Sequence, residues 1–152
     1  MMFPADKGTY ILILRLSKPV SLTPGRLGTF DFPGGWYAYV GSAFGPGGLR
    51  GRLKHHLAPI NKPHWHVDYL RDTATVREVW WLASETVYEH QWAAVLRGLP
   101  GAAVPALRFG ASDCTCESHL FHFPRQPDFA AFRDSSNQPL RRHRVPSAPD
   151  NT

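Results

Sequence analysis

The stretch GTYILILRL, residues 8–16, has an apolar or aromatic side chain at every position from Tyr10 to Leu14. Such a run is typical of a β-strand covered on both faces, because alternate side chains then pack against opposite layers. The same run also fits a short buried helix. We interpret the stretch as the central strand of a sheet.

The segment TFDFPGGWYAYVG, residues 29–41, contains two aromatic-rich runs on either side of Pro33, Gly34 and Gly35. Aromatic residues favour strands, and proline followed by glycine favours a turn, so the segment predicts a β-hairpin. The next β-prone run is TVREVWWLA, residues 75–83.

Leucines at positions 49, 53 and 57 recur every four residues and predict an amphipathic helix after a glycine-proline loop. A short helix is expected in HWHVDYLRD, residues 64–72, and a longer one in TVYEHQWAAVLRGLPG, residues 86–101. The order of strand, hairpin, helices, strand and helix indicates a small α/β domain, with helices packed on a short sheet.

The 152 residues fit one globular domain, which we place at residues 1–127. Beyond it the chain is rich in Pro, Ser, Asp and Arg and loses its periodicity, so residues 128–152 are expected to form a basic, poorly ordered tail. The formal net charge is +5 and the sequence pI is about 9.6. This charge suits either a polyanion partner or simply a basic protein.

Two features bear on the compartment. No apolar run is long enough to cross a bilayer, and the start MMFPADKGTY lacks the layout of a signal peptide. We therefore expect a cytoplasmic protein with no membrane partner. Cys114 and Cys116 are one residue apart, which would strain an intrachain disulfide, so we expect reduced thiols.

The helix after the glycine-proline loop carries candidate phosphate ligands. Arg52 and His56 lie one turn apart on it, beside the leucine stripe. Two potential cations at the border of a buried face would lie at the lip of a groove, where they could bind a phosphate. Arg50 and Lys54 point farther toward solvent, and their expected roles are solubility or loose contact with a nucleic-acid backbone.

Glu89 flanks Trp92 and Leu96 on its predicted helix, at the margin of the apolar face. A carboxylate there needs a partner or a metal ion. The alternative is a capping box in TVYE, residues 86–89, in which the glutamate bonds back to the first turn. The residues leave both interpretations open.

His64 and His66 are two positions apart in HWHVDYL. This spacing would place them on one face of a strand but well apart on a helix. Because the segment is predicted to be helical, we expect one of the two histidines to serve the site.

The segment SDCTCESHLFH, residues 112–122, contains four residues able to bind zinc: Cys114, Cys116, His119 and His122. The single residue between the cysteines departs from the spacing of about two to four that is usual in structural zinc sites. A local structural role is preferred, and a zinc-stabilised interaction protein is the alternative.

Several blocks occur in a fixed order, beginning with GTY at residues 8–10 and YVG at residues 39–41, then Arg52 and Glu89. This set resembles the GIY-YIG endonuclease superfamily. It is most similar to the small stand-alone Uri branch, in which YVGSA, GGL, HWHVDYL and SDCTCESHL are typical blocks. The resemblance covers residues 8–123. It implies an α+β domain with a short central, mostly antiparallel three-stranded sheet flanked by helices.

The resemblance assigns five residues to the site: Tyr10, Tyr39, Arg52, His56 and Glu89. Tyr10 would position or deprotonate the attacking water, with its pKa lowered by nearby cations and metal, and Tyr39 would support it through a hydrogen bond. Arg52 would stabilise the phosphate, and His56 would contact the scissile group or share the proton transfer. Glu89 would hold one Mg²⁺ or Mn²⁺ ion.

The function implied by this resemblance is a divalent-metal-dependent endonuclease that hydrolyses phosphodiester bonds in nucleic acid, with DNA favoured over RNA. We expect a monomer or a weak homodimer. The alternative is a non-catalytic nucleic-acid-binding module that uses the same basic groove. The chain departs from the family pattern in its longer FGPGG loop. It also lacks a clear equivalent of the asparagine that follows the glutamate in many members, for which Ser112 and Asp113 are the candidates.

Overall fold

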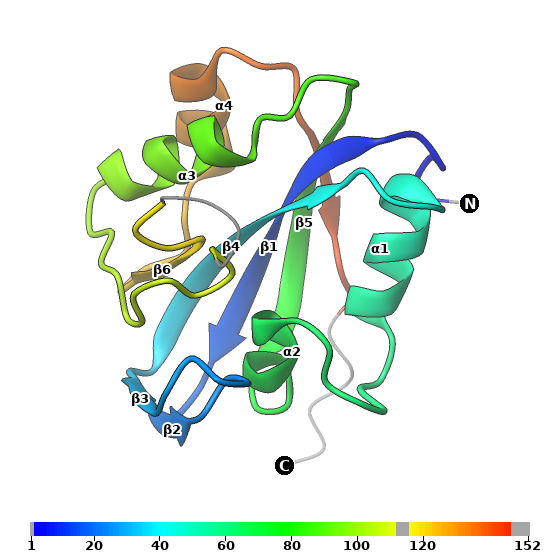
Figure 1. Cartoon of the computed structure of the whole chain (residues 1–152). Coiled ribbons are helices and arrows are strands. Elements are labelled where there is room, and N and C mark those ends of the chain that lie inside the picture. Colours follow the sequence, from blue (N-terminus) through cyan, green and yellow to red (C-terminus); the bar gives the residue numbers. More distant parts are fainter. Residues whose placement is uncertain (1, 112–115, 147–152) are drawn as a thin grey trace.

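The computed structural model describes residues 2–111 and 116–146. In chain order the elements are β1 (Gly8–Leu16), β2 (Val20–Leu22), β3 (Phe30–Phe32), β4 (Gly35–Ala43), α1 (Gly48–Leu57), α2 (His66–Arg71), β5 (Thr75–Ala83), α3 (Glu89–Gly98), β6 (Leu120–Phe123), α4 (Phe129–Ser136) and β7 (Arg141–Arg144). Five strands form an antiparallel sheet in the order β6-β4-β1-β5-β7, while β2 and β3 form a separate pair. The chain therefore has an α+β fold, with β1 at the centre of the main sheet (Figure 1).

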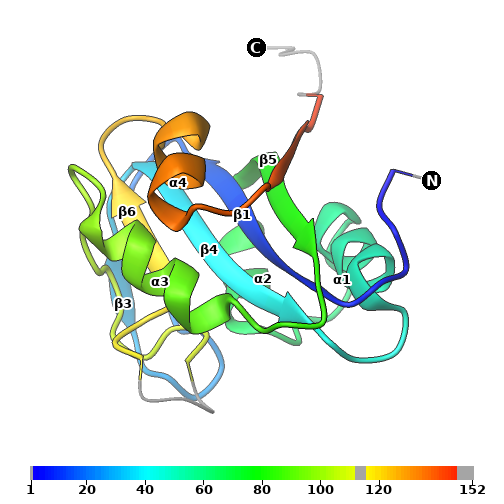
Figure 2. The same ribbon diagram turned by 90° about the horizontal axis from the view of Figure 1, so that it is seen from above.

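The main sheet lies between two layers of helices (Figure 2). On one face, Leu12 of β1 belongs to a core that includes Leu53 of α1. On the other face, Ile11 packs in a second core with Trp92 of α3 and Phe132 of α4. Alternate residues of β1 thus enter different cores, which explains its continuous apolar run. The interpretation of residues 8–16 as a central strand is confirmed, and the helical alternative is wrong.

The expected hairpin across residues 33–35 is wrong. β3 pairs with β2, and β4 pairs instead with β1 along its whole length, from Gly35 opposite Leu16 to Ala43 opposite Gly8. A nine-residue strand finds more backbone partners in β1 than the three-residue β3 can offer. The small β2–β3 pair is an excursion between the two long strands (Figure 1).

The three-stranded sheet implied by the resemblance is too small, because β6 and β7 extend it at both edges. β7 lies within the region predicted to be a poorly ordered tail, and so does α4, so the boundary at residue 127 is wrong. Phe132 of α4 is fully buried against Trp80 and Trp92. Arg142 of β7 donates two hydrogen bonds to the buried Glu78 carboxylate. The burial of Phe132 and the bidentate ion pair between Arg142 and Glu78 therefore fix this segment to the sheet, although its overall composition is polar.

The predictions for residues 49–57, 64–72 and 75–83 are confirmed as α1, α2 and β5. The last predicted helix is also present, but it begins at Glu89 and not at Thr86. Within the described residues, no helix combines the length and apolar character needed to cross a bilayer.

Candidate functional site

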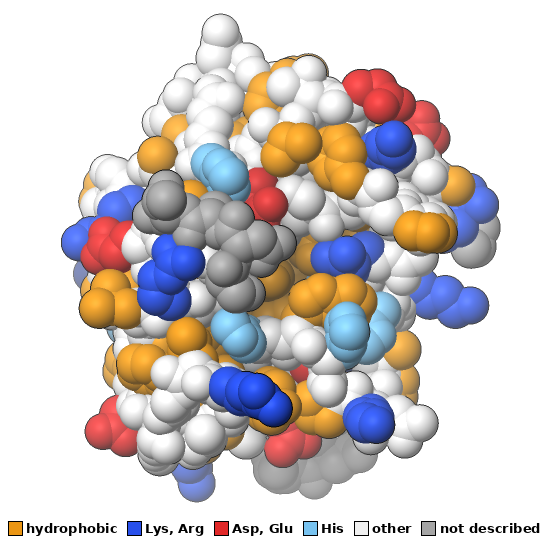
Figure 3. Space-filling model, in the orientation of Figure 1, with side chains coloured by type: hydrophobic (Ala, Val, Ile, Leu, Met, Phe, Trp, Pro, Cys, Tyr) orange, Lys and Arg blue, Asp and Glu red, His pale blue; other side chains and the backbone are white. Residues whose placement is uncertain are grey.

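A cleft of about 290 Å³ opens between the second half of β4 and the helices α1, α2 and α3. Its lining consists of Tyr39, Gly41, Ser42, Arg52, His64, Trp65, His66, Glu89 and Gly110. Histidine, lysine and arginine side chains gather on the face of the molecule shown in Figure 3. Three of the five residues assigned to the site, Tyr39, Arg52 and Glu89, line the cleft directly.

The two short signatures are neighbours in the sheet, because β1 and β4 pair so that Tyr10 lies opposite Gly41. A Cβ atom on Gly41 would lie 2.4 Å from the Tyr10 hydroxyl, so only glycine leaves room for the tyrosine ring. Gly8 is equally crowded, since a Cβ there would lie 2.4 Å from the Leu82 carbonyl oxygen. The glycines of both signatures therefore allow close packing beside the buried tyrosine.

Gly41→Ala is expected to lower the free energy of unfolding by about 1–3 kcal/mol, because the added methyl group forces the Tyr10 ring out of its position. Gly45→Ala is the matched control, since a Cβ at Gly45 meets no atom within 4 Å. Urea denaturation of both variants measures the difference. Equal stabilities for the two variants would contradict the packing role of Gly41.

Tyr10 lies beneath the cleft floor and has no exposed surface. Its hydroxyl is 2.8 Å from His56 Nε2 and 3.4 Å from Arg52 Nη1. His56 is also fully buried, so its expected position at the lip of a groove is wrong. Of the expected pair on α1, only Arg52 reaches the cleft surface.

Burial sets the protonation states of this buried pair. It raises the pKa of Tyr10 to about 12, although Arg52 acts in the opposite direction. Arg52 lowers this pKa as expected, but loss of hydration outweighs it, so the pKa of Tyr10 lies above its usual value and not below it. Burial also lowers the pKa of His56 to about 3. Both side chains are consequently neutral near pH 7.

Asp68 of α2 lies behind His56, with Oδ1 3.9 Å from His56 Nδ1. Burial alone would raise the pKa of Asp68, but hydrogen bonds from the backbone N–H groups of Trp65 and His64 and from His55 lower it. The carboxylate is therefore ionised, and it favours the tautomer in which His56 carries its proton on Nδ1. His56 Nε2 then accepts the hydrogen bond from the Tyr10 hydroxyl.

Arg52 lies across the cleft from the strands, and its guanidinium stacks over Trp65 at 4.2 Å from the ring centre. This cation–π contact holds the planar group while leaving donors available for an anion. His64 and His66 both line the cleft, and the expectation that one of them serves the site stays a prediction. They flank Trp65, the N-cap residue of α2.

Glu89 is the first residue of α3 and points back to the strands. Its Oε2 accepts a hydrogen bond of 2.6 Å from Ser42, and its Oε1 lies 3.0 Å from His119 Nδ1. Burial raises the pKa of Glu89, but the hydrogen bonds from His119 and Ser42 outweigh it, and the pKa lies below its usual value. The N-cap residue of α3 is Tyr88 and makes no side-chain capping bond. The capping-box alternative is wrong, and Glu89 is an ionised carboxylate facing the cleft.

Tyr39 lines the cleft but is almost completely buried, and burial raises its pKa well above the usual value. Its ring packs edge-on against His56 at 6.4 Å between centres. Tyr39 therefore contacts the buried Tyr10–His56 pair through the packing of its ring against His56. The hydrogen bond expected between Tyr39 and Tyr10 stays a prediction.

Other candidate residues lie away from the cleft. Arg50 donates through Nε to the Phe3 carbonyl oxygen, and Lys54 is exposed on α1. Neither residue lines the cleft. The polar candidates Ser112 and Asp113 lie outside the described residues, as does Cys114.

Sequence reasoning missed four residues that shape the site: Ser42, Trp65, Asp68 and Gly110. The first three lie inside the blocks YVGSA and HWHVDYL, so these blocks could have indicated them as site residues. Gly110 carries no such signal; its N–H donates to His66 Nδ1, and its φ of 70° favours glycine.

Comparison with known proteins gives one match. A family model described as "Domain of unknown function DUF123" matches residues 9–140. No curated protein and no solved structure matches the chain. The matched range includes all cleft residues and continues through α4, but it ends before the edge strand β7.

Proposed function

The chain belongs to the DUF123 family, whose description assigns no activity, and we propose from its site that it is a divalent-metal-dependent endonuclease. It hydrolyses phosphodiester bonds in nucleic acid, preferring DNA to RNA, in the manner of GIY-YIG enzymes. One observation carries the proposal: the ionised carboxylate of Glu89 and the guanidinium of Arg52 share one cleft, with the neutral Tyr10–His56 pair beneath it.

Glu89 fits a Mg²⁺ or Mn²⁺ ion. Its carboxylate is ionised and 20 % exposed, and Ser42 and His119 fix its orientation. Mg²⁺ usually binds through one or two carboxylates, with water and substrate phosphate completing its shell. A bound ion would supply positive charge to the phosphate and lower the pKa of a water molecule.

Arg52 is suited to bind the scissile phosphate. Its stacking on Trp65 restricts the side chain, and guanidinium donors match the oxygens of a phosphate. His64 and His66 add imidazole groups on the same side of the cleft. Arg50 and Lys54 lie outside the cleft and would contribute at most to contacts with more distant phosphates.

Tyr10 is suited to orient the attacking water, and its phenolate form could accept a proton from that water. Because its O–H donates to His56 Nε2, a remaining lone pair of the oxygen accepts from Arg52 Nη1. When Arg52 turns to the substrate phosphate, a water molecule takes its place beside the Tyr10 oxygen. The hydroxyl of Tyr10 orients this water, and His56 keeps that hydroxyl in position.

The second candidate is a nucleic-acid-binding module without catalysis. The complete burial of Tyr10 and its pKa of about 12 favour it, because a buried phenol is a poor base at neutral pH. The same cleft would then bind a phosphate through Arg52 without breaking a bond.

A panel of single-stranded, duplex and branched DNA and RNA tests the proposal, with Mg²⁺, Mn²⁺ or EDTA in parallel. We expect cleavage with either ion, none with EDTA, and faster cleavage of DNA than of RNA. Absence of cleavage from every substrate, by protein shown to be folded, would leave the binding module as the better description.

A further inference from the structure

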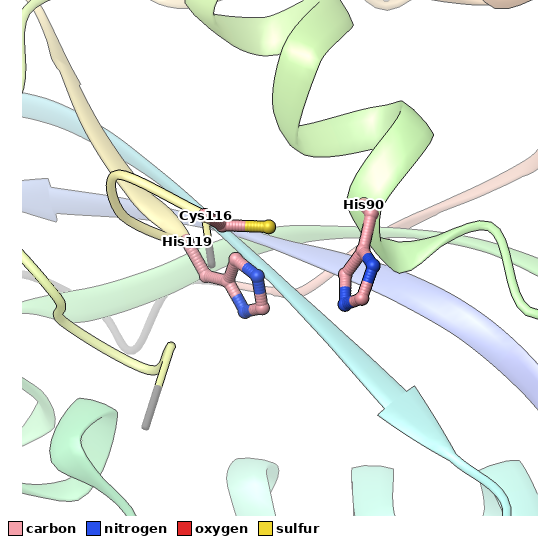
Figure 4. Close-up of side chains that lie close together, drawn as sticks. All are labelled: His90, Cys116 and His119. Carbon is pink, nitrogen blue, oxygen red and sulfur yellow. The ribbon is translucent and has the colours of Figure 1, made fainter. Parts of the chain in front are cut away.

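A second group of metal-binding side chains lies beside Glu89, outside the cleft. His90 of α3, Cys116 and His119 approach one another, as Figure 4 shows. Their possible ligand atoms all lie within 4.8 Å of one another. His119 is buried, Cys116 is half-buried and His90 is exposed, so the group runs from the core to the surface.

The chemistry of these side chains selects a different ion from the one proposed for Glu89. One thiolate and two imidazoles are typical ligands of Zn²⁺, whereas Mg²⁺ prefers oxygen. In a tetrahedral zinc site, bonds of about 2.0–2.3 Å place neighbouring ligand atoms about 3.3–3.8 Å apart. The ligand atoms need to close by at most about 1.5 Å to reach this geometry, and the exposed His90 side chain can rotate toward the other two.

The contact between His119 and Glu89 supports the same conclusion. His119 Nδ1 lies 3.0 Å from Glu89 Oε1. If Nδ1 carries the proton, Nε2 keeps its lone pair for a metal ion. A carboxylate behind a zinc-binding histidine is a common arrangement, because it fixes both the tautomer and the ring orientation.

A path for the ion is also present. A surface hollow of about 170 Å³ is lined by His90 and Cys116 together with Arg97, Glu117 and other residues. Arg97 and Glu117 form an ion pair of 3.7 Å. The half-buried thiol can therefore be reached from solvent without unfolding of α3.

We propose that His90, Cys116 and His119 form a zinc site whose fourth ligand is water. The ion fixes His119, and through it the carboxylate of Glu89. The binding of zinc is independent of the proposed nuclease function. An effect of zinc on catalysis through Glu89, in contrast, rests on that proposed function. Because no nucleic acid is needed to measure zinc, failure of the two proposals can be told apart.

The test loads the full chain with Zn²⁺, removes unbound metal by dialysis and measures zinc per chain by atomic spectrometry. We expect one zinc per chain for the wild type. Cys116→Ser and His90→Ala are each expected to weaken zinc binding about a hundredfold or more, and Glu89→Gln about tenfold to a hundredfold. His143→Ala is the control, because His143 lies in β7 against Phe3 and should retain the zinc.

Cobalt substitution identifies the ligands. We expect the wild type with Co²⁺ to show thiolate-to-cobalt charge-transfer absorption, and Cys116→Ser to lose it. His90→Ala, which changes an exposed side chain, tests the site even if Cys116→Ser unfolds. A wild type without stoichiometric zinc would overturn the site, and so would retention of wild-type affinity in folded His90→Ala or Cys116→Ser.

Discussion

Glu89→Gln is expected to reduce the rate of metal-dependent cleavage about a thousandfold. Glutamine has the size of glutamate and keeps an acceptor for the Ser42 hydroxyl, but it brings no negative charge to a divalent ion. The ionised state of Glu89 in the folded protein makes this loss of charge the main change. Single-turnover cleavage in Mg²⁺, compared with the wild type on the same substrate, measures the effect.

Glu85→Gln is the matched control for this variant. Glu85 lies four residues earlier, its side chain is 87 % exposed, and its partner Lys7 is 3.9 Å away. The same chemical change at Glu85 should leave the rate unaltered. Thermal unfolding of both variants shows whether the fold is retained. A folded Glu89→Gln that cleaves at the wild-type rate would remove Glu89 from the mechanism.

Tyr10→Phe is expected to reduce the cleavage rate about a hundredfold, because the attacking water loses the oxygen that orients it. The substitution also leaves His56 Nε2 without its partner at 2.8 Å. The free energy of unfolding should therefore fall by about 1–2 kcal/mol, a change that leaves the protein folded. Cleavage rates and urea denaturation are measured on the same preparation.

Tyr37→Phe separates catalysis from stability. The Tyr37 hydroxyl donates to the Pro33 carbonyl oxygen, so its removal also deletes a hydrogen bond made by a buried tyrosine of β4. We expect comparable destabilisation with an unchanged rate. Equal losses of activity in the two variants would assign Tyr10 a structural role only.

The pH dependence of the cleavage rate distinguishes a catalytic role of Tyr10 from a packing role, because loss of packing alone would not change it. Because the pKa of Tyr10 is about 12, its phenolate fraction rises about tenfold per pH unit below that value. If Tyr10 takes the proton, the wild-type rate should climb from about pH 6 to about pH 9, and Tyr10→Phe should flatten this slope. An identical profile in both proteins would assign the proton transfer to another group.

The fold was predictable where the local pattern agrees with the tertiary structure. The unbroken apolar run of residues 8–16 and the leucine spacing of α1 both reflect faces that are buried in the fold. The pairing of β3 with β2, and the formation of α4 and β7 in the last part of the chain, depend on contacts with residues that are distant in sequence. Glu78 and Arg142 are 64 positions apart, and no local pattern joins them.

Residue types in the site were easier to predict than their environments. Spacing placed Arg52 and His56 on one side of α1, but it did not reveal that one reaches the cleft and the other is buried against Tyr10. The pKa of Tyr10 was misjudged for the same reason, because burial is a property of the whole fold. The contact between Glu89 and His119 joins residues 30 positions apart, and it became visible only in three dimensions.

Binding and cleavage measured on one sample of wild-type protein separate a nuclease from a binding module. DNA is added in the presence of EDTA, binding is measured at several salt concentrations, and Mg²⁺ or Mn²⁺ is then added. We expect salt-dependent binding first and strand cleavage only after the ion. A folded protein that binds the DNA and leaves every strand intact with both ions would contradict the endonuclease.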